Sequence, residues 1–261
     1  MRYGAMKSKI DIRDYTIDKK TGLPEEFELT NIPDVKNQHD VGACVAFVAS
    51  EIAEYFEMKQ CNDNDKLSAG YIYGTRYKYK GEGMYLRDAL KTLKNIGTCK
   101  QSKFVYNREV PEIIEKVKNS KITFSDTQHC RITAYYRCDE IEDIKTAIYT
   151  TGPVMLAVDW YEDNYCLQSN PYVIYPGTKN QGGHAIFVYG WNKDGLLFQN
   201  SWGRSWGNKG RAILSYDYPI KEAWGVTDTY IENDYHKKSN NLPKIIYEII
   251  NAILNIIFYR R

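Results

Sequence analysis

The sequence has few of the features that would name a partner or a compartment. None of its six cysteines forms a CxxC pair, which excludes the common zinc-binding spacings. The formal charge is only +2, from 35 Lys and Arg against 33 Asp and Glu, so no overall field attracts nucleic acid or acidic membranes. The opening residues MRYGAMKSKIDIRDYTIDKK lack the apolar run of a secretory signal. We therefore expect a metal-free, cofactor-free chain in the cytoplasm or in a virion or host-cell interior.

The remaining pattern divides the chain into three parts. Residues 1–33 mix charges with isolated apolar residues and read as an irregular extension, called the leader below. Residues 34–234 form the main domain. Its first part, about 41–125, contains helical apolar spacing over 43–59, 88–94 and 111–117. Its second part, about 126–230, is a series of short β-branched and aromatic runs separated by turns, which predicts a sheet.

The tail, residues 235–261, combines a polar linker with the amphipathic helix pattern KIIYEIINAILNIIFYRR. The apolar stretch 245–259 is shorter than the ~20 residues that span a bilayer. We expect it to pack on the domain or to mediate self-association; membrane contact as an interfacial helix is the less favoured alternative.

One cysteine, Cys44, lies at the start of a predicted helix. In VKNQHDVGACVAFVAS, residues 35–50, a polar run leads through Gly42 into a small, apolar helix pattern with Cys44 at its start. The simplest interpretation is a small hydrophobe beginning a buried helix. A helix N-terminus also stabilises an anion, however, so this position favours a thiolate and makes Cys44 a candidate nucleophile.

A nucleophile needs a base, and the chain has only four histidines. His184 stands out in QGGHAIFVYGW because it follows two glycines at the start of an apolar strand. The later run FQNSWGRSWGNKG places Asn200 at a turn, where its side chain could hold the His184 tautomer, and Trp202 could shield that hydrogen bond from water. A buried structural histidine is the alternative.

The order Gln38, Cys44, His184, Asn200 resembles that of the papain-like cysteine peptidases, over about residues 35–231. The resemblance implies an α+β, two-lobe fold, with a helical lobe and an antiparallel β-rich lobe on either side of a cleft. It implies that Cys44 attacks the scissile carbonyl and that His184 exchanges the protons. Asn200 would orient His184, and the Gln38 amide with the Cys44 backbone N–H would bind the oxyanion.

Two departures from the family pattern concern a disulfide. The family usually has a cysteine three residues before the nucleophile, where this chain has Val41, and its partner position corresponds to Gly81. Both halves are absent together, as in bacterial and viral members. The leader also lacks the long helical period of the family's inhibitory propeptides, and we hypothesise that it lies across or beside the cleft.

The resemblance also assigns a substrate groove. A roomy apolar pocket between the walls predicts a bulky apolar substrate residue two positions before the cut, called P2. Core packing is the alternative role for each wall residue. The predicted groove residues are Gly83, Met84, Tyr85, Ala157, Gly183, Ala185 and Trp202, with Trp224 as a candidate pocket floor.

The stretch YIYGTRYKYKGEG, residues 71–83, interleaves tyrosine with basic residues, which could bind nucleic acid. In a nearly neutral chain, a surface loop beside the groove is the better interpretation, and we expect no nucleic-acid partner.

The main prediction is thus a cysteine endopeptidase that acts on peptides or proteins. The same acyl-enzyme chemistry would also serve a peptide ligase or transamidase, and product analysis with an added amine would distinguish them. A noncatalytic peptide binder would have no need of all four residues. A cysteine-histidine cell-wall hydrolase fits the Asn-Ser-Trp turn less well.

Overall fold

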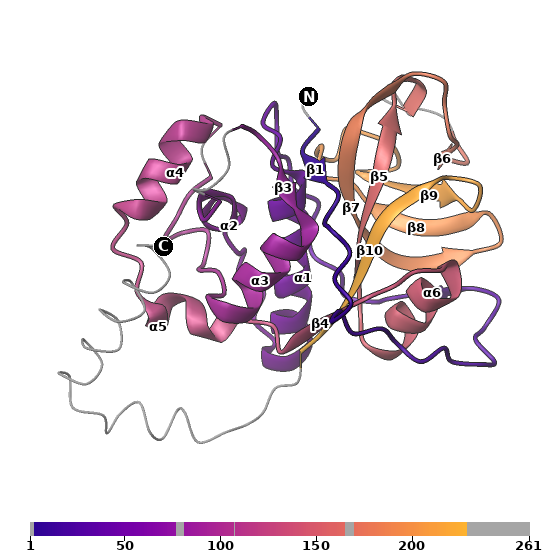
Figure 1. Cartoon of the computed structure of the whole chain (residues 1–261), viewed down its shortest axis with the longest axis horizontal. Coiled ribbons are helices and arrows are strands. Elements are labelled where there is room, and N and C mark those ends of the chain that lie inside the picture. Colours follow the sequence, from indigo (N-terminus) through magenta and orange to yellow (C-terminus); the bar gives the residue numbers. More distant parts are fainter. Residues whose placement is uncertain (1–2, 77–80, 107, 165–169, 229–261) are drawn as a thin grey trace.

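The structure, a computed structural model, describes residues 3–76, 81–106, 108–164 and 170–228. The predicted tail helix, the predicted self-association through 245–259 and Cys166 lie outside these residues. In the described part, helices gather on one side of the molecule and a sheet on the other, with the N-terminal segment running between them (Figure 1). The α+β fold class expected above is confirmed. No helix among these residues is long and apolar enough to cross a membrane.

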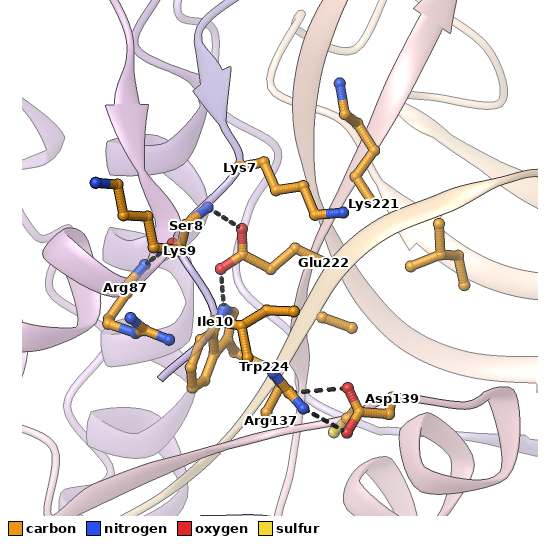
Figure 2. Close-up of a pocket in the computed structure, with 13 residues that line it drawn as sticks. Lys7, Ser8, Lys9, Ile10, Arg87, Arg137, Asp139, Lys221, Glu222 and Trp224 are labelled. Carbon is orange, nitrogen blue, oxygen red and sulfur yellow. Dashed lines mark hydrogen bonds and ion pairs between the residues drawn. The ribbon is translucent and has the colours of Figure 1, made fainter. Parts of the chain in front are cut away.

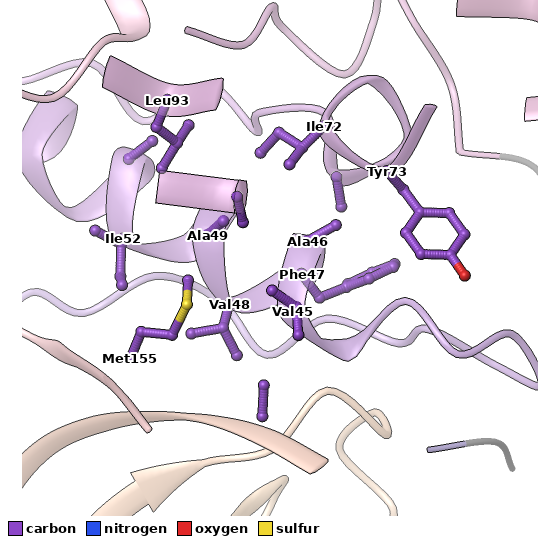
Figure 3. Packing of buried hydrophobic residues seen from close by; sticks show 14 of the residues in the cluster. Val45, Ala46, Phe47, Val48, Ala49, Ile52, Ile72, Tyr73, Leu93 and Met155 are labelled. Atoms are coloured by element: carbon purple, nitrogen blue, oxygen red, sulfur yellow. The ribbon is translucent and has the colours of Figure 1, made fainter. Parts of the chain in front are cut away.

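The helical side is built around α1, Cys44–Cys61. Every residue from Cys44 to Phe56 is buried, which explains why the sequence is apolar around the whole helix at its start. Figure 3 shows Val45, Val48 and Ile52 of α1 among residues of neighbouring elements. The other helices of this lobe are α2 (Ala69–Gly74), α3 (Leu86–Asn95), α4 (Val110–Lys118) and α5 (Phe124–Thr127), followed by the 3-10 turn η1 (Gln128–Cys130).

The other side is an eight-stranded sheet in the order β4-β10-β5-β7-β8-β9-β6, with β2 added alongside β7. Only the β6–β9 pair is parallel among the pairs of this sheet that the structure describes. The strands are β2 (Phe27–Glu28), β4 (Ala134–Arg137), β5 (Val154–Tyr161), β6 (Val173–Ile174), β7 (Asn180–Asn192), β8 (Gly195–Gln199), β9 (Arg211–Ser215) and β10 (Ile220–Thr227), with the 3-10 turn η2 (Glu162–Asn164) after β5.

Two short strands lie outside this sheet and join the leader to the helical lobe. β1 (Ala5–Met6) pairs in parallel with β3 (Met84–Tyr85). One hydrophobic cluster fills the helical lobe and extends to Met155, Ala157 and Ala185 of the sheet, while a second fills the sheet lobe. The lobes therefore share apolar packing directly beneath the end of α1 that carries Cys44.

One local prediction was wrong, and the β-rich half includes helical elements as well as strands. Residues 71–74 were expected in a surface loop, but they form most of α2, where Gly70 and Gly74 allow close packing. A Cβ on Gly74 would lie 2.2 Å from Val117 Cγ2 of α4. The β-rich half contains a helix, α6 (Ile141–Thr150), which begins with a capping box between Glu140 and Asp143. In the same half, the 3-10 turn η1 precedes the first strand, β4.

Candidate active site

Cys44 is the first residue of α1, and its side chain is completely buried. The backbone N–H groups of Ala185 in β7 and of Gly4 in the leader are directed at its sulfur and favour the thiolate. Burial nevertheless dominates and raises the pKa of the thiol, because desolvation disfavours the thiolate. The residue is therefore held as a neutral thiol while the leader lies over it.

His184 lies in β7, immediately before Ala185. Its Nε2 is 2.8 Å from Asn200 Oδ1, and both side chains are fully buried. The Trp202 ring lies 4.8 Å from the imidazole, centroid to centroid, and the Trp160 ring 4.9 Å. Burial lowers the pKa of His184 to about 4, and the Asn200 bond opposes this shift only in part. Nδ1 is buried without a hydrogen-bond partner among the described residues.

Gln38 is held between the two lobes. Its backbone N–H donates to the Ser201 carbonyl at 2.8 Å, and Ser201 Oγ donates to Gln38 Oε1 at 2.6 Å. The side-chain amide Nε2 donates to the Val41 carbonyl at 2.8 Å, so it points toward the loop before Cys44. The segment after Asn200 thus fixes the side chain that was predicted to bind the oxyanion.

The four residues predicted to be catalytic are brought to one place by three contacts. α1 presents the sulfur to the backbone of β7, Asn200 holds the imidazole of that strand, and Ser201 holds Gln38. Burial raises the pKa of Cys44 and lowers that of His184, so it favours the neutral forms of both groups while the leader covers them. Among the residues that the structure describes, no group of three or more His, Cys, Asp or Glu side chains is arranged to hold a metal ion.

Comparison with known proteins agrees with this geometry. Residues 23–228 match the model of the papain family cysteine proteases. The chain belongs to the papain family. It is a cysteine peptidase, as the family match and the cathepsin B-like relatives show.

The similar proteins include viral, animal and bacterial members of the papain family. An uncharacterized peptidase C1-like protein of Acanthamoeba polyphaga mimivirus is 26% identical, over 97% of this chain and 89% of that protein. Cathepsin B-like cysteine proteinase 4 of Caenorhabditis elegans is 30% identical over 77% of this chain and 71% of its own. Among solved structures, xylellain of Xylella fastidiosa gives a TM-score of 0.77 at 22% identity, covering 87% of this chain and 96% of that one.

The leader of this papain-family chain passes directly over Cys44. The Gly4 N–H is directed at the sulfur, and the Gly4 carbonyl accepts from the Met84 N–H at 2.7 Å. A Cβ on Gly4 would lie 1.9 Å from the Gly42 carbonyl oxygen, so the fit requires glycine. On the other wall, a Cβ on Gly183 would meet the Ala5 carbonyl at 2.1 Å. The leader backbone is therefore in close contact with both sides of the site.

Further along, the leader continues beside β10 of the sheet. The Ser8 N–H donates to Glu222 Oε2 at 2.8 Å, and Trp224 Nε1 donates to the other oxygen at 2.5 Å. Figure 2 shows these bonds, with Arg87 beside the leader. Asp14 of the leader forms an ion pair with Arg87. A cavity of about 160 Å³ remains beneath Lys7 to Ile10.

The predicted groove residues lie around this covered site. Gly83 has a φ of +94°, and a Cβ there would meet the Gly4 carbonyl at 2.8 Å, so close backbone approach does require glycine at this position. Ala157 is opposite Ala185 in the β5–β7 register. Met84, Ala157, Ala185 and Trp224 belong to one buried cluster, Tyr85 is half-buried at its edge, Gly183 contacts Ala5, and Trp202 packs on His184.

Four residues of the site were not identified from the sequence: Tyr3, Glu51, Trp160 and Ser201. Tyr3 lies edge-on to the His184 ring at 6.0 Å, and nothing in the leader marks it. Trp160 was visible only as an aromatic at a strand end, and Ser201 only as part of the Asn-Ser-Trp turn. Glu51 had one signal, an acidic residue inside an otherwise apolar helix turn.

Proposed function

We propose that the chain is an endopeptidase in which Cys44 is the nucleophile and His184 the general base and acid. The observation that supports this most directly is the buried 2.8 Å contact between His184 and Asn200, on the strand whose next N–H contacts the Cys44 sulfur. Together with Gln38 at the same site, this arrangement supplies the nucleophile, the base, the orienting amide and an oxyanion donor.

In the proposed reaction the Cys44 sulfur bonds to the scissile carbonyl carbon as its proton passes to His184. The resulting oxyanion accepts from the Cys44 backbone N–H and from the Gln38 amide, whose present acceptor is the Val41 carbonyl. His184 then gives the proton to the leaving amine, the C–N bond breaks, and an acyl-thioester remains. Water, deprotonated by His184, releases the acid and restores the thiol.

The groove supports a preference for a bulky apolar P2 residue. Two alanines, Ala157 and Ala185, occupy paired positions in the sheet, and Met84 lies in the same buried cluster. Small side chains facing a methionine leave room for an apolar group once the leader is displaced. Cleavage of a peptide set that varies only at P2 tests this. Leu is expected to exceed Ala by about 60-fold if its three additional carbons are fully buried, since each contributes about 0.8 kcal/mol, and Phe is expected to exceed Ala as well.

We further propose that residues 1–33 hold the enzyme inactive. The leader excludes water from Cys44 and His184, and its β1 occupies the edge of β3 to which an extended substrate would add. Its backbone presents an N–H to the sulfur, where a substrate would present a carbonyl carbon.

The experiment is labelling with an epoxide that alkylates activated cysteines. A chain that lacks only residues 1–9 keeps β2 and the Pro24 carbonyl that accepts from Trp191 Nε1 at 3.2 Å. We expect it to be labelled at one site, Cys44, and to cleave peptides, whereas its Cys44→Ala variant is expected to do neither. An unlabelled shortened chain with intact circular dichroism would refute the peptidase mechanism; equal labelling of the full-length chain would refute inhibition by the leader.

A further inference from the structure

A buried carboxyl group lies behind the catalytic residues and is not used by the proposed mechanism. Glu51 is on α1, two turns after Cys44, and is fully buried. Its Oε1 accepts from Gln199 Nε2 at 3.1 Å, across the boundary between the lobes. The backbone N–H of Lys36 is also directed at the carboxyl and favours its charged form.

These contacts connect three separate segments that carry the catalytic residues. Gln199 immediately precedes Asn200, Lys36 is two residues before Gln38, and α1 begins at Cys44. Gln199 cannot easily reorient, because its Oε1 accepts from Arg211 Nε at 3.2 Å and its Nε2 also donates to the Pro33 carbonyl at 3.2 Å. Glu51 therefore contacts a side chain whose position is already fixed by the sheet lobe.

We propose that Glu51 is a positioning residue, which ties the helix bearing Cys44 to the two segments bearing Gln38 and Asn200. The inference rests on the catalytic roles proposed above, because it assigns Glu51 an effect on those residues and no contact with the substrate.

The surrounding charges determine whether the Glu51 carboxyl is protonated or ionised. Lys36 Nζ lies 2.7 Å from Glu54 Oε1, and this pair is itself buried. Lys36 is the cation that acts on Glu51, and Glu54 is the second carboxylate; Gln199, with Arg211 behind it, faces Glu51 from the sheet lobe. One lysine cannot neutralise two buried carboxylates, so charge balance favours a protonated Glu51.

Two observations agree with this assignment. Oε2 of Glu51 is buried with no hydrogen-bond partner among the described residues, so the donors directed at the carboxyl leave one of its oxygens unpaired. Burial raises the pKa of Glu51 to about 8, against the opposing effect of Lys36. Glu51 is therefore neutral near neutral pH. As the pH rises through about 8, a second negative charge forms beside Glu54 and disfavours the packing of α1 on the sheet lobe, although the Gln199 bond itself favours the charged form.

The test compares Glu51→Gln, Glu51→Ala and wild type, each as the full-length chain and without residues 1–9, by the rate of epoxide alkylation of Cys44 between pH 5 and 9.5. The shortened chains give the rates at pH 6, where the leader keeps the full-length chain nearly unreactive. At each pH, the rate of a variant is divided by the rate of the wild-type chain of the same length. This ratio removes the effect of the leader and the titration of Cys44 and His184, which all variants share. Glu51→Gln keeps a neutral acceptor for Gln199; it is expected to react within about twofold of wild type at pH 6 and to exceed it severalfold above pH 8. Glu51→Ala is expected to react at least tenfold more slowly at pH 6.

Glu57→Gln is the matched control, because Glu57 is a partly buried carboxyl on the same helix whose pKa burial also raises, to about 7, away from the catalytic segments. It is expected to follow wild type at every pH. A folded Glu51→Ala that reacts like wild type would overturn the inference, as would a Glu51→Gln ratio that does not change with pH. If Glu51→Ala does not fold, the Glu51→Gln ratio decides.

Thermal unfolding gives a readout that does not depend on catalysis. A group whose pKa is raised in the folded state destabilises that state progressively between its unfolded pKa, near 4.5, and its folded value. Glu51→Gln should therefore gain in melting temperature over wild type from pH 5 to pH 8, and an unchanged difference would contradict a neutral Glu51. Wild type that is never labelled, even without residues 1–9, would overturn the proposed function, and the positioning role with it.

Discussion

Docking of the leader over Cys44 can be weakened by a single substitution, without removing any of the chain. Gly4 is in backbone contact with Gly42, and a Cβ built on it would lie 1.9 Å from the Gly42 carbonyl oxygen and 2.5 Å from its carbon. Neither atom belongs to a flexible side chain, so Gly4→Val forces the leader away from Cys44. Overpacking of this kind costs about 1–3 kcal/mol, which weakens docking of the leader by about 5- to 150-fold.

If only the open form reacts, epoxide labelling of full-length Gly4→Val should rise by the same factor, up to the rate of the chain without residues 1–9. Ile12→Ser is the control: Ile12 is in the leader but is fully exposed, at 100%, and its replacement should leave the rate unchanged. The reasoning is refuted if Gly4→Val reacts no faster than wild type while the shortened chain reacts fast, since the contact at Gly4 would then not hold the leader.

Three further predictions follow from the site. In the chain without residues 1–9, Gln38→Ala should lower kcat by about 100-fold or more by removing an oxyanion donor; a loss below tenfold in steady-state assays would exclude that role. Burial raises the pKa of Cys44 and lowers that of His184 to about 4, so iodoacetamide should alkylate Cys44 in the full-length chain appreciably only at alkaline pH. The shortened chain should already react near pH 6, and coincident pH profiles would contradict this. Trp160→Ala should lower the free energy of unfolding by about 3–5 kcal/mol, because Trp160 is fully buried against His184, Trp202 and Trp206; urea denaturation measures it, and a loss under about 1 kcal/mol would show that the site collapses around the gap.

The family and the fold class were predictable because their signals are local. The small apolar run after Cys44, the two glycines before His184 and the turn at Asn200 each lie within a short window of sequence. Their order along the chain was enough to indicate the papain family, which the comparisons confirm. α6 was also signalled locally, by the Glu140–Asp143 capping box and the apolar spacing after it, and was overlooked among the strands.

The supporting contacts were not predictable, because they depend on how the lobes pack. Glu51 and Gln199 are 148 residues apart, and Gln38 and Ser201 are 163 apart. In the sequence, each of these four residues is an ordinary polar residue. Their contacts form only when the helical lobe packs on the sheet lobe. The position of Tyr3 and Gly4 likewise follows from backbone pairing with β3, which a two-residue strand does not reveal in its own sequence.

The backbone contacts of Gly4 bear on whether a molecule can cleave its own leader. With a hydrogen-bond donor of Gly4 at the sulfur and its carbonyl engaged by Met84, a molecule at rest does not offer its own bound stretch for attack. The accessible stretch lies farther on, where Ile10 and Ile12 are 78% and 100% exposed. If the leader inhibits as proposed, cutting there falls to another molecule. A fresh preparation should then show a lag that shortens as its concentration rises, and a trace of the chain without residues 1–9 should abolish it.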